Sequence, residues 1–358
     1  MNPKTVIVGM SGGVDSSVSA WLLKSLGYRV IGLFMKSWEE FDDRGVCKSS
    51  IEYADVVRVC EQLQIPCYTV NLVEEYQNRV FAAFLADLEK GLTPNPDVLC
   101  NREIKFDAFL KKAKEFNADF LATGHYCRLD PQHRLLTGVD PHKDQTYFLH
   151  AVNQNVFKNV LFPIGHLHKS EVRALARKAN LATSEKKDST GICFIGKRDF
   201  KPFLSQYLGY KIGNLCRLNG EIVGCHDGAA FYTIGQRKGL GLGGEGEAWF
   251  VVGKDIAKNE VYVERGANHS ALFSNQLIAF GLHWIGEKPR SFPYRCTAKI
   301  RYRGVASSCT LFPQEQGQLL AQFEEMQRAV TPGQSIVFYD GEYCLGGAQI
   351  VKAAVSRR

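Results

Sequence analysis

The sequence predicts an α/β fold: a doubly wound parallel sheet in the first half of the chain, followed by two small β domains, the last of them a β-barrel. Between residues 5 and 125, apolar strand patterns alternate with helical patterns, which is the order of βαβ units around a parallel sheet. From Gly213 onward, glycines separate short runs of β-type residues, the pattern of small β domains or barrels. We therefore expect three domains, at 1–205, 206–275 and 276–358.

The individual elements follow from the spacing of apolar residues. Val18, Leu22 and Leu26 fall at helical spacing after the first glycine-rich turn, and Gly27 is a typical stop. Apolar runs predict strands at 5–8, 29–35, 66–72 and 119–125, and helical spacing predicts helices at 51–63 and 74–90. Short strands are expected later at 247–252, 260–263, 297–302 and 335–339. A parallel sheet binds its ligands at the carboxyl ends of its strands.

The turn after the first strand carries the most informative motif, Ser11-Gly12-Gly13-Val14-Asp15-Ser16-Ser17. Its glycines allow a sharp turn, its serines add hydroxyl donors, and the following helix supplies N–H groups and a positive dipole end. The turn matches neither a Walker loop nor the dinucleotide-binding pattern. It resembles the pyrophosphate loop of enzymes that split ATP into AMP and pyrophosphate. An ordinary glycine turn, with Asp15 and Ser16 as helix caps, is the alternative.

Length and composition fit a multidomain enzyme without a membrane span. The 358 residues suffice for two or three domains, and 45% apolar with 23% charged residues is ordinary for globular proteins. No apolar stretch approaches the roughly 18 residues of a transmembrane helix. A formal charge of +7 is compatible with a nucleic-acid partner. Eleven cysteines without any Cys-x-x-Cys indicate free thiols in a reducing cytoplasm, and they argue against a zinc ribbon.

Two further segments place thiols in polar surroundings. Residues 93–101 form a proline-stiffened loop in which Cys100 follows Asp97 by three positions, so a group that handles protons stands near a nucleophile. Cys193 lies beyond a polar, glycine-containing stretch, where Lys186 and Lys187 would favour its thiolate. Taken alone, Cys100 is as well explained as a small buried apolar residue.

Together these segments resemble the bacterial tRNA-specific 2-thiouridylases, which sulfurate the wobble uridine of the anticodon. The resemblance spans nearly the whole chain, and the thiol-bearing motifs are its most specific part. It rests on Gly-Met-Ser-Gly-Gly-Val-Asp-Ser-Ser (9–17), Phe-Met-Lys (34–36) with Trp38, Asn-Pro-Asp-Val-Leu-Cys-Asn (95–101), Ala-Thr-Gly-His-Tyr (122–126), Lys-Asp-Gln-Thr-Tyr-Phe-Leu (143–149), Asp-Ser-Thr-Gly-Ile-Cys-Phe-Ile-Gly (188–196), Tyr-Thr-Ile-Gly-Gln-Arg-Lys-Gly-Leu (232–240), Lys-Ile-Arg-Tyr-Arg (299–303) and Thr-Pro-Gly-Gln (331–334).

The resemblance implies a fold and a reaction. The fold is the pyrophosphate-loop, adenine nucleotide alpha hydrolase-like sheet, and the reaction is ATP-dependent 2-thiolation of U34 with release of AMP and pyrophosphate. Cys193 carries a persulfide that a sulfur-relay partner delivers, Cys100 is the second catalytic thiol, and Asp97 is the acid/base group. Direct persulfide attack and prior release of hydrosulfide both remain open. Both leave a Cys100–Cys193 disulfide that a reductant reopens. The expected tRNAs are those of the Lys, Glu and Gln type.

The resemblance also assigns binding residues. ATP is expected to contact Gly9, Met10, Ser11, Gly12, Gly13, Val14, Asp15, Ser16, Met35 and Gly124, with Mg²⁺ at Asp15. The tRNA and its target base are expected at Asn95, Pro96, Asp97, His125, Lys143, Asp144, Gln145, Arg301, Tyr302 and Gln334. Ordinary structural roles compete at several of these positions: a core methionine at residue 35, a turn glycine at 124, a satisfied polar side chain at 125 and a helix cap at 143–145.

Two features of the remaining sequence bear on cofactors and partners. Basic residues gather near the C-terminal end, and alternation at Lys299, Arg301 and Arg303 predicts three cations on one face of a strand, suited to a phosphate backbone. Cys127 adds a third thiol near the presumed site. It leaves an iron–sulfur cluster open as a cofactor, although no ligand spacing supports one.

Two other classes of function also fit parts of the pattern. A pyrophosphate-loop synthetase that activates a different oxygen, as in argininosuccinate or amide formation, needs the loop but not the two thiols. A non-catalytic RNA-binding protein with a relic nucleotide site needs neither ATP cleavage nor sulfur transfer. Loss of activity in Cys193→Ser separates the first class from a thiolation enzyme, and AMP release separates the second.

Overall fold

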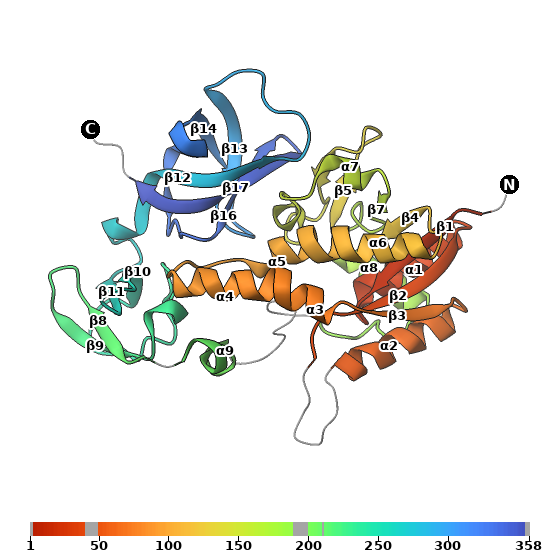
Figure 1. Ribbon diagram of the computed structural model, residues 1–358, viewed down its shortest axis with the longest axis horizontal. Coiled ribbons are helices and arrows are strands. Elements are labelled where there is room, and N and C mark those ends of the chain that lie inside the picture. Colours follow the sequence, from red (N-terminus) through yellow and green to blue (C-terminus); the bar gives the residue numbers. More distant parts are fainter. Residues whose placement is uncertain (1–2, 40–48, 189–199, 210, 355–358) are drawn as a thin grey trace.

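The computed structural model describes residues 3–39, 49–188, 200–209 and 211–354. Figure 1 shows a parallel sheet with its helices, a small central β part and a C-terminal barrel. The predicted fold class is confirmed. Within the described residues, no helix is long and apolar enough to cross a membrane.

The first sheet has the strand order β3-β2-β1-β4-β7, and its strands pair in parallel. Residues alternate along β1 between two cores: Ile7 packs into one apolar cluster, Val6 and Val8 into another. Because neighbouring residues of a strand point to opposite faces, both faces of the sheet are covered, as a doubly wound fold requires. The strands are β1 (Thr5–Met10), β2 (Arg29–Lys36), β3 (Cys67–Asn71), β4 (Phe120–Ala122) and β7 (Val160–Leu161).

Helices cover the two faces of this sheet. The face with Val6 and Val8 packs against α1 (Val14–Ser25), α2 (Ser49–Gln62) and α8 (Lys169–Lys178). The face with Ile7 packs against helical segments from α3 (Val73–Tyr76), η1 (Gln77–Phe81) and α4 (Ala82–Glu89) to α5 (Pro96–Leu99), η2 (Cys100–Ala108) and α6 (Phe109–Glu115). The helix predicted at 74–90 is therefore present, with a π-helical stretch in it. Shorter helices are η3 (Thr146–Phe148), α7 (Gln154–Phe157), α9 (Phe200–Leu208), η4 (Ala229–Phe231), η5 (Ser270–Leu272) and η6 (Glu315–Gly317).

The second half of the chain forms two β units. The central sheet has the order β10-β11-β8-β9, and the C-terminal sheet β12-β15-β14-β13-β16-β17 closes into a barrel because β12 also pairs with β17. The central strands are β8 (Gly213–Cys216), β9 (Ile222–His226), β10 (Trp249–Asp255) and β11 (Glu260–Arg265). The barrel strands are β12 (Phe273–Trp284), β13 (Tyr294–Lys299), β14 (Ser307–Pro313), β15 (Gln318–Arg328), β16 (Ser335–Asp340) and β17 (Tyr343–Ala354).

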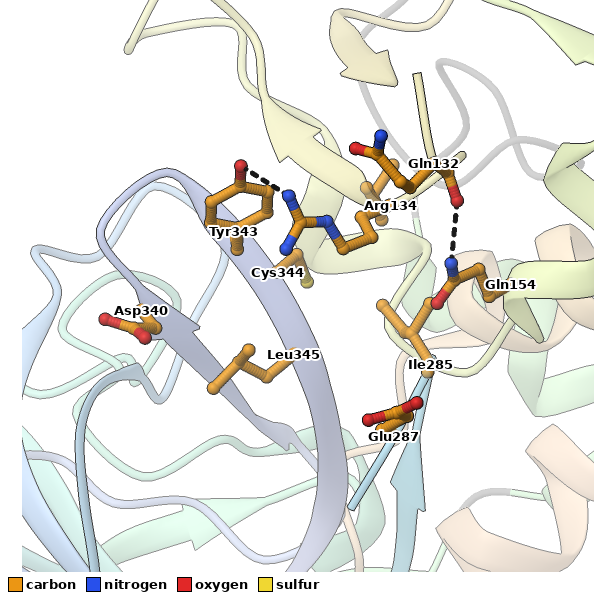
Figure 2. A pocket seen from close by; sticks show the side chains of 11 residues that line it. Gln132, Arg134, Gln154, Ile285, Glu287, Asp340, Tyr343, Cys344 and Leu345 are labelled. Carbon is orange, nitrogen blue, oxygen red and sulfur yellow. Dashed lines mark hydrogen bonds between the residues drawn. The ribbon is translucent and has the colours of Figure 1, made fainter. Parts of the chain in front are cut away.

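A hairpin from the first half of the chain extends the barrel sheet. It consists of β5 (Cys127–Leu129) and β6 (Leu135–Thr137), and β6 pairs with β17. A cleft of about 600 Å³ lies at this joint, shown in Figure 2. Arg134 stacks over the ring of Tyr343 at 4.2 Å and donates to its hydroxyl at 2.9 Å. The predicted site residues do not line this cleft.

Candidate functional site

The turn between β1 and α1 has a backbone that brings it close to its neighbours. Met10 ends β1, and α1 begins at Val14 with Gly13 as its N-cap. Gly12 has φ +70°, and a Cβ there would lie 2.6 Å from the carbonyl oxygen of Glu52. A side chain is therefore excluded at Gly12 both by the left-handed backbone and by α2. Gly13 has an extended backbone (φ −96°) and, as a glycine, brings no side chain to the first N–H groups of the helix.

The serines of the turn differ in what they bond. Ser16 Oγ donates to the carbonyl oxygen of Gly13 at 3.1 Å and accepts from the N–H of Ser11 at 3.2 Å. Ser17 Oγ donates to the same carbonyl at 2.8 Å and accepts from Thr183 Oγ1 at 2.9 Å. Ser16 and Ser17 are buried, whereas Ser11 is exposed. Ser16 and Ser17 thus hold the loop in shape, and the Ser11 hydroxyl is the one presented at the surface.

Asp15 is held by side chains rather than by the helix backbone. Lys169 Nζ donates to both of its carboxylate oxygens, at 2.7 and 2.9 Å. The Tyr126 hydroxyl donates to Oδ1 at 2.7 Å. Burial, followed by the nearby Asp15 carboxylate, raises the pKa of Tyr126, so this hydroxyl keeps its proton and remains a donor. The alternative role of Asp15 as a helix cap is therefore not what its side chain does.

Further cations converge on Asp188, which lies in the segment that follows α8. Its Oδ1 contacts Lys169 Nζ at 2.9 Å and Arg173 Nη2 at 2.7 Å, and its Oδ2 contacts Lys143 Nζ at 2.5 Å. Burial would raise the pKa of Asp188, but hydrogen bonds from Lys143 and Lys169 outweigh it and lower the pKa to about 2. The carboxylate is charged at neutral pH and fixes three cations beside the loop.

A fourth cation reaches the loop itself. Lys186 Nζ donates to the carbonyl oxygen of Gly12 at 2.9 Å and to Asp55 Oδ2 at 2.5 Å. We call Lys143, Lys169, Arg173 and Lys186 the basic cluster. The sequence alone does not assign Lys169 or Arg173 to the nucleotide, and it places Lys186 beside Cys193 instead. The available signal was the loop's lack of a lysine, because a phosphate site without its own cation needs cations from elsewhere.

Two other predicted ATP contacts lie at carboxyl ends of the parallel strands. Gly124 follows β4, and a Cβ there would lie 2.9 Å from Ser16 N and 3.0 Å from the carbonyl carbon of Asp15. The end of β4 therefore packs directly on the first turn of α1, which only glycine allows. Met35 lies near the end of β2, opposite Val70 of β3, and is partly buried against the core.

Asp97 and Cys100 lie on one helical segment. Asn95 caps it by accepting the N–H of Asp97 at 3.1 Å, and Pro96 occupies the first turn, where its missing N–H costs nothing. Asn101 Nδ2 donates to the carbonyl oxygen of Asp97 at 2.9 Å. Cys100 is fully buried at the start of η2. Cys193 lies outside the described residues, and so does the predicted Cys100–Cys193 pairing.

Three predicted RNA contacts are engaged by the protein itself. His125 is buried, its Nδ1 lies 2.7 Å from Thr123 Oγ1, and burial lowers its pKa well below the usual range, so it is neutral. Asp144 is buried and accepts from Thr146 Oγ1 at 2.8 Å and from Lys299 Nζ at 3.0 Å. Gln145 Oε1 accepts the N–H of Tyr126 at 3.0 Å. Structural roles thus account for the contacts of these side chains.

The prediction of three cations on one strand face is wrong. The strand β13 ends at Lys299, and Arg303 lies in the following turn with φ +63°. Arg301 is partly buried, and its Nη2 donates to the carbonyl oxygens of Ile234 and Ala329 at 2.8 and 2.9 Å. Backbone acceptors from the central part and the barrel therefore fix Arg301. Tyr302 lies under the Arg303 guanidinium, 5.3 Å from ring centre to Cζ.

A second cleft lies between the first half of the chain and the barrel. Its volume is about 310 Å³, and Lys143, Lys299 and Arg303 bring positive charge to it. His142 and Asp144 also line it. The structure thus brings the predicted contacts Lys143 and Asp144 together with cations that follow or end β13. Gln334 lies elsewhere, at the turn before β16, and bonds to the loop that precedes Asp97.

Among the described residues, no group of three or more His, Cys, Asp or Glu side chains is arranged to hold a metal ion. Cys127 is fully buried in β5, and burial raises its pKa well above the usual value. Its thiol is therefore protonated, unlike a thiolate ligand.

Family models match three consecutive stretches: "tRNA methyl transferase HUP domain" at residues 4–197, "tRNA methyl transferase PRC-barrel domain" at 201–265, and "Aminomethyltransferase beta-barrel domain" at 274–350. The tRNA-specific 2-thiouridylase MnmA of Protochlamydia amoebophila is 60% identical over 98% of this chain and 94% of its own length. That of Halalkalibacterium halodurans is 55% identical over 96% and 94%.

Solved structures are similar only at a lower level. A 4-thiouridine synthetase–RNA complex with bound ATP has 18% identity and a TM-score of 0.37, and covers 57% of this chain and 49% of that one. The curated relatives align over nearly the full length at more than half identity, and the chain therefore belongs to the family of tRNA-specific 2-thiouridylases.

Proposed function

We propose that this chain is an ATP-dependent tRNA 2-thiouridylase, which transfers AMP onto the C2 oxygen of U34 and replaces that oxygen by sulfur. The observation that carries the proposal is the basic cluster around the glycine loop, in a chain of this family. Lys169 and Lys186 bring two ammonium groups to a loop that has no lysine of its own. Such a site suits a triphosphate and a departing pyrophosphate.

The activation step follows from the chemistry of the leaving group. The C2 oxygen of uridine leaves poorly, so it first attacks the α-phosphorus of ATP, and the bond from that phosphorus to the bridging β-phosphate oxygen breaks. Pyrophosphate departs into the loop at residues 11–17, where the basic cluster neutralises its charge. The residues proposed to contact ATP, at 9–16, Met35 and Gly124, lie at or near the carboxyl ends of β1, β2 and β4, where parallel sheets bind their ligands.

Mg²⁺ is proposed to travel with ATP, as the metal that nucleotide phosphates carry. Both oxygens of Asp15 already accept hydrogen bonds from Lys169, and Oδ1 also accepts one from Tyr126. Asp15 therefore becomes a ligand only if Lys169 turns from the carboxylate to the phosphates. An iron–sulfur cluster is not part of the proposal.

The sulfur step uses Cys193 and Cys100. In one route, the terminal persulfide sulfur on Cys193 attacks C2 and AMP leaves; the Cys100 thiolate then attacks the Cys193 sulfur, which breaks the sulfur–sulfur bond and frees 2-thiouridine. In the other, Cys100 first displaces hydrosulfide, which attacks C2. Either route ends in a Cys100–Cys193 disulfide, and a reductant returns two electrons. Asp97 lies in the first turn of the same helical segment as Cys100 and is proposed to act as the acid/base group of the reaction.

The tRNA, of the Lys, Glu or Gln type, is proposed to contact Lys143, Tyr302, Gln334 and the loop at 95–97, while Asp144, Gln145, His125 and Arg301 support that surface from within. Sulfur arrives from a relay protein that carries a persulfide, in the cytoplasm. Residues 1–205 are proposed to activate and sulfurate the base, residues 206–275 to connect the other two domains, and residues 276–358, which include most of the barrel, to bind tRNA.

The test is a reconstituted reaction. Purified protein is incubated with ATP, Mg²⁺, sulfide and unmodified tRNA, and 2-thiouridine and AMP are measured. The expected result is one AMP per thiolated base. Folded protein that forms neither product contradicts the proposal. AMP formation that survives in Cys193→Ser and does not depend on tRNA favours a synthetase, and tRNA binding without AMP favours an RNA-binding protein.

A further inference from the structure

A second pair of thiols lies outside the candidate site, in the barrel wall. Cys296 of β13 and Cys309 of β14 are directly opposite each other in an antiparallel pair, and their Sγ atoms are 3.8 Å apart. Opposed residues in such a pair have Cα atoms about 4.5 or 5.5 Å apart, and both values fall within the range that disulfides span. Side-chain rotation can therefore bring the two sulfurs to bonding distance without moving the strands apart.

The two thiols differ in access. Cys309 is 2% exposed and belongs to the barrel core, whereas Cys296 is only partly buried against that core. The hydrogen bond with Cys296, together with burial, raises the pKa of Cys309. A reagent from solution therefore meets Cys296 first, and Cys309 reacts second, from inside the wall.

The position of the pair gives it a consequence for RNA. The strands β13 and β14 lie side by side in the barrel (Figure 1), and residues 300–306 connect them. This connection carries Tyr302 and Arg303, and Arg303 lines the cleft of about 310 Å³ with Lys143. A covalent link between Cys296, which precedes that turn, and Cys309, which follows it, would tie the two strands together close to the turn.

We propose that Cys296 and Cys309 are a redox-active dithiol whose oxidation stiffens the 300–306 turn and weakens tRNA binding. The oxidant is a small-molecule disulfide such as glutathione disulfide. The Cys296 thiolate attacks one of its sulfurs, and one glutathione thiolate leaves. The Cys309 thiolate then attacks the Cys296 sulfur and expels the second. The two thiols lose two electrons and two protons in all, and glutathione disulfide becomes two thiols.

Peptide mapping tests the bond itself. The full chain is treated with glutathione disulfide, digested with trypsin without reduction, and analysed by mass spectrometry. We expect the peptide 296–299 to be linked to 304–328, the link to vanish with dithiothreitol, and Cys296→Ser and Cys309→Ala to lack it. Cys225, an exposed thiol, serves as the control and should carry only a glutathione adduct. Adducts without the 296–309 link overturn the proposal.

The effect on RNA rests on the proposed function and is measured separately. Oxidation should weaken binding of unmodified tRNA by about fivefold, the lower end of typical coupling between sites, and should leave binding by Cys296→Ser unchanged. Equal affinity of the oxidised and reduced wild-type protein overturns the coupling. If neither form binds tRNA, the proposed function fails, while the mapped peptides still decide whether the dithiol exists.

Discussion

Gln334 of the barrel donates a hydrogen bond from Nε2 to the carbonyl oxygen of Thr93, 2.7 Å away. The N–H of Thr93 donates in turn to the carbonyl oxygen of Pro332 at 2.8 Å. Between these contacts, Gly333 has φ +92°, and a Cβ there would lie 2.6 Å from Thr93 N. Thr93 stands just before Asn95, which caps the helix of the predicted catalytic residues. The barrel thus fixes the approach to that helix.

Gln334→Ala is expected to lower kcat/KM for thiolation about fivefold, because loss of a hydrogen bond to a carbonyl costs roughly 1 kcal/mol and frees the loop at Thr93. Single-turnover thiolation and tRNA affinity are measured together, so that loop positioning and direct RNA contact are separated. The matched control is Gln349→Ala, whose Nε2 bonds to Asp87 at an exposed position. A similar loss in both variants contradicts a specific role for the contact.

Lys169→Gln is expected to reduce tRNA-dependent AMP release about 10- to 100-fold, since charged hydrogen bonds contribute roughly 1.5–3 kcal/mol each. The substitution removes the ammonium that Asp15 and Asp188 share. AMP release is followed as a function of ATP concentration. Lys178→Gln, an exposed lysine at the far end of α8, is the control and should match the wild type. Wild-type kinetics in Lys169→Gln would remove the basic cluster from the mechanism.

Gly124→Ala is expected to destabilise the protein by about 1–3 kcal/mol and to weaken ATP binding, because the added Cβ lies 2.9 Å from Ser16 N and pushes the start of α1 away from β4. Urea unfolding and ATP titration measure the two effects. The control is Gly243→Ala, where an added Cβ has no neighbour within 4 Å. Equal stability of the two variants would show that the backbone at the end of β4 shifts to accommodate the added Cβ.

The alternation of strands and helices and the glycine loop were predictable because they depend on local patterns. A continuous apolar run indicates that β1 is buried on both faces, and two glycines in a strand–helix turn indicate where a ligand can approach. The partners of the loop were not predictable, because Lys169 lies 154 residues from Asp15 and Lys186 lies 174 residues from Gly12. The position of a lysine in the sequence does not indicate which distant carboxylate it will contact in the fold.

For the Lys299–Arg303 segment, a local sequence pattern predicted a strand that the structure does not contain. Alternating charge predicted a strand, but backbone acceptors from two other parts of the chain capture Arg301, and Arg303 takes a left-handed turn. Local alternation is a weak signal when a tertiary contact competes with it. The roles of Cys100 and Asp97 were suggested by the family motif, and the pairing of Cys100 with Cys193 stays a prediction.

Stability is expected to fall as the pH drops from about 6.5 toward 3. Burial lowers the pKa of His150 from 6.5 to about 3, and it lowers that of His125 well below 6.5. Between those values the unfolded chain binds a proton that the folded protein does not, so each buried histidine makes the unfolding free energy decrease with falling pH. Asp188 acts in another window: its pKa is lowered to about 2, so its contribution persists until the pH falls below about 3.8.

His150→Gln is the test, because His150 Nε2 bonds to Ser335 Oγ at 3.0 Å, where the first half of the chain meets the barrel. Urea unfolding at several values between pH 7 and pH 5 should show a smaller pH dependence in the variant, by up to about 1.4 kcal/mol per pH unit, the contribution of one proton. The variant's absolute stability is not the readout, because the bond to Ser335 also changes. His166→Gln, at an exposed position, should keep the full slope. An unchanged slope in His150→Gln would mean that His150 takes up its proton over the same pH range in the folded and the unfolded protein, and the lowered pKa of the buried imidazole would then be wrong.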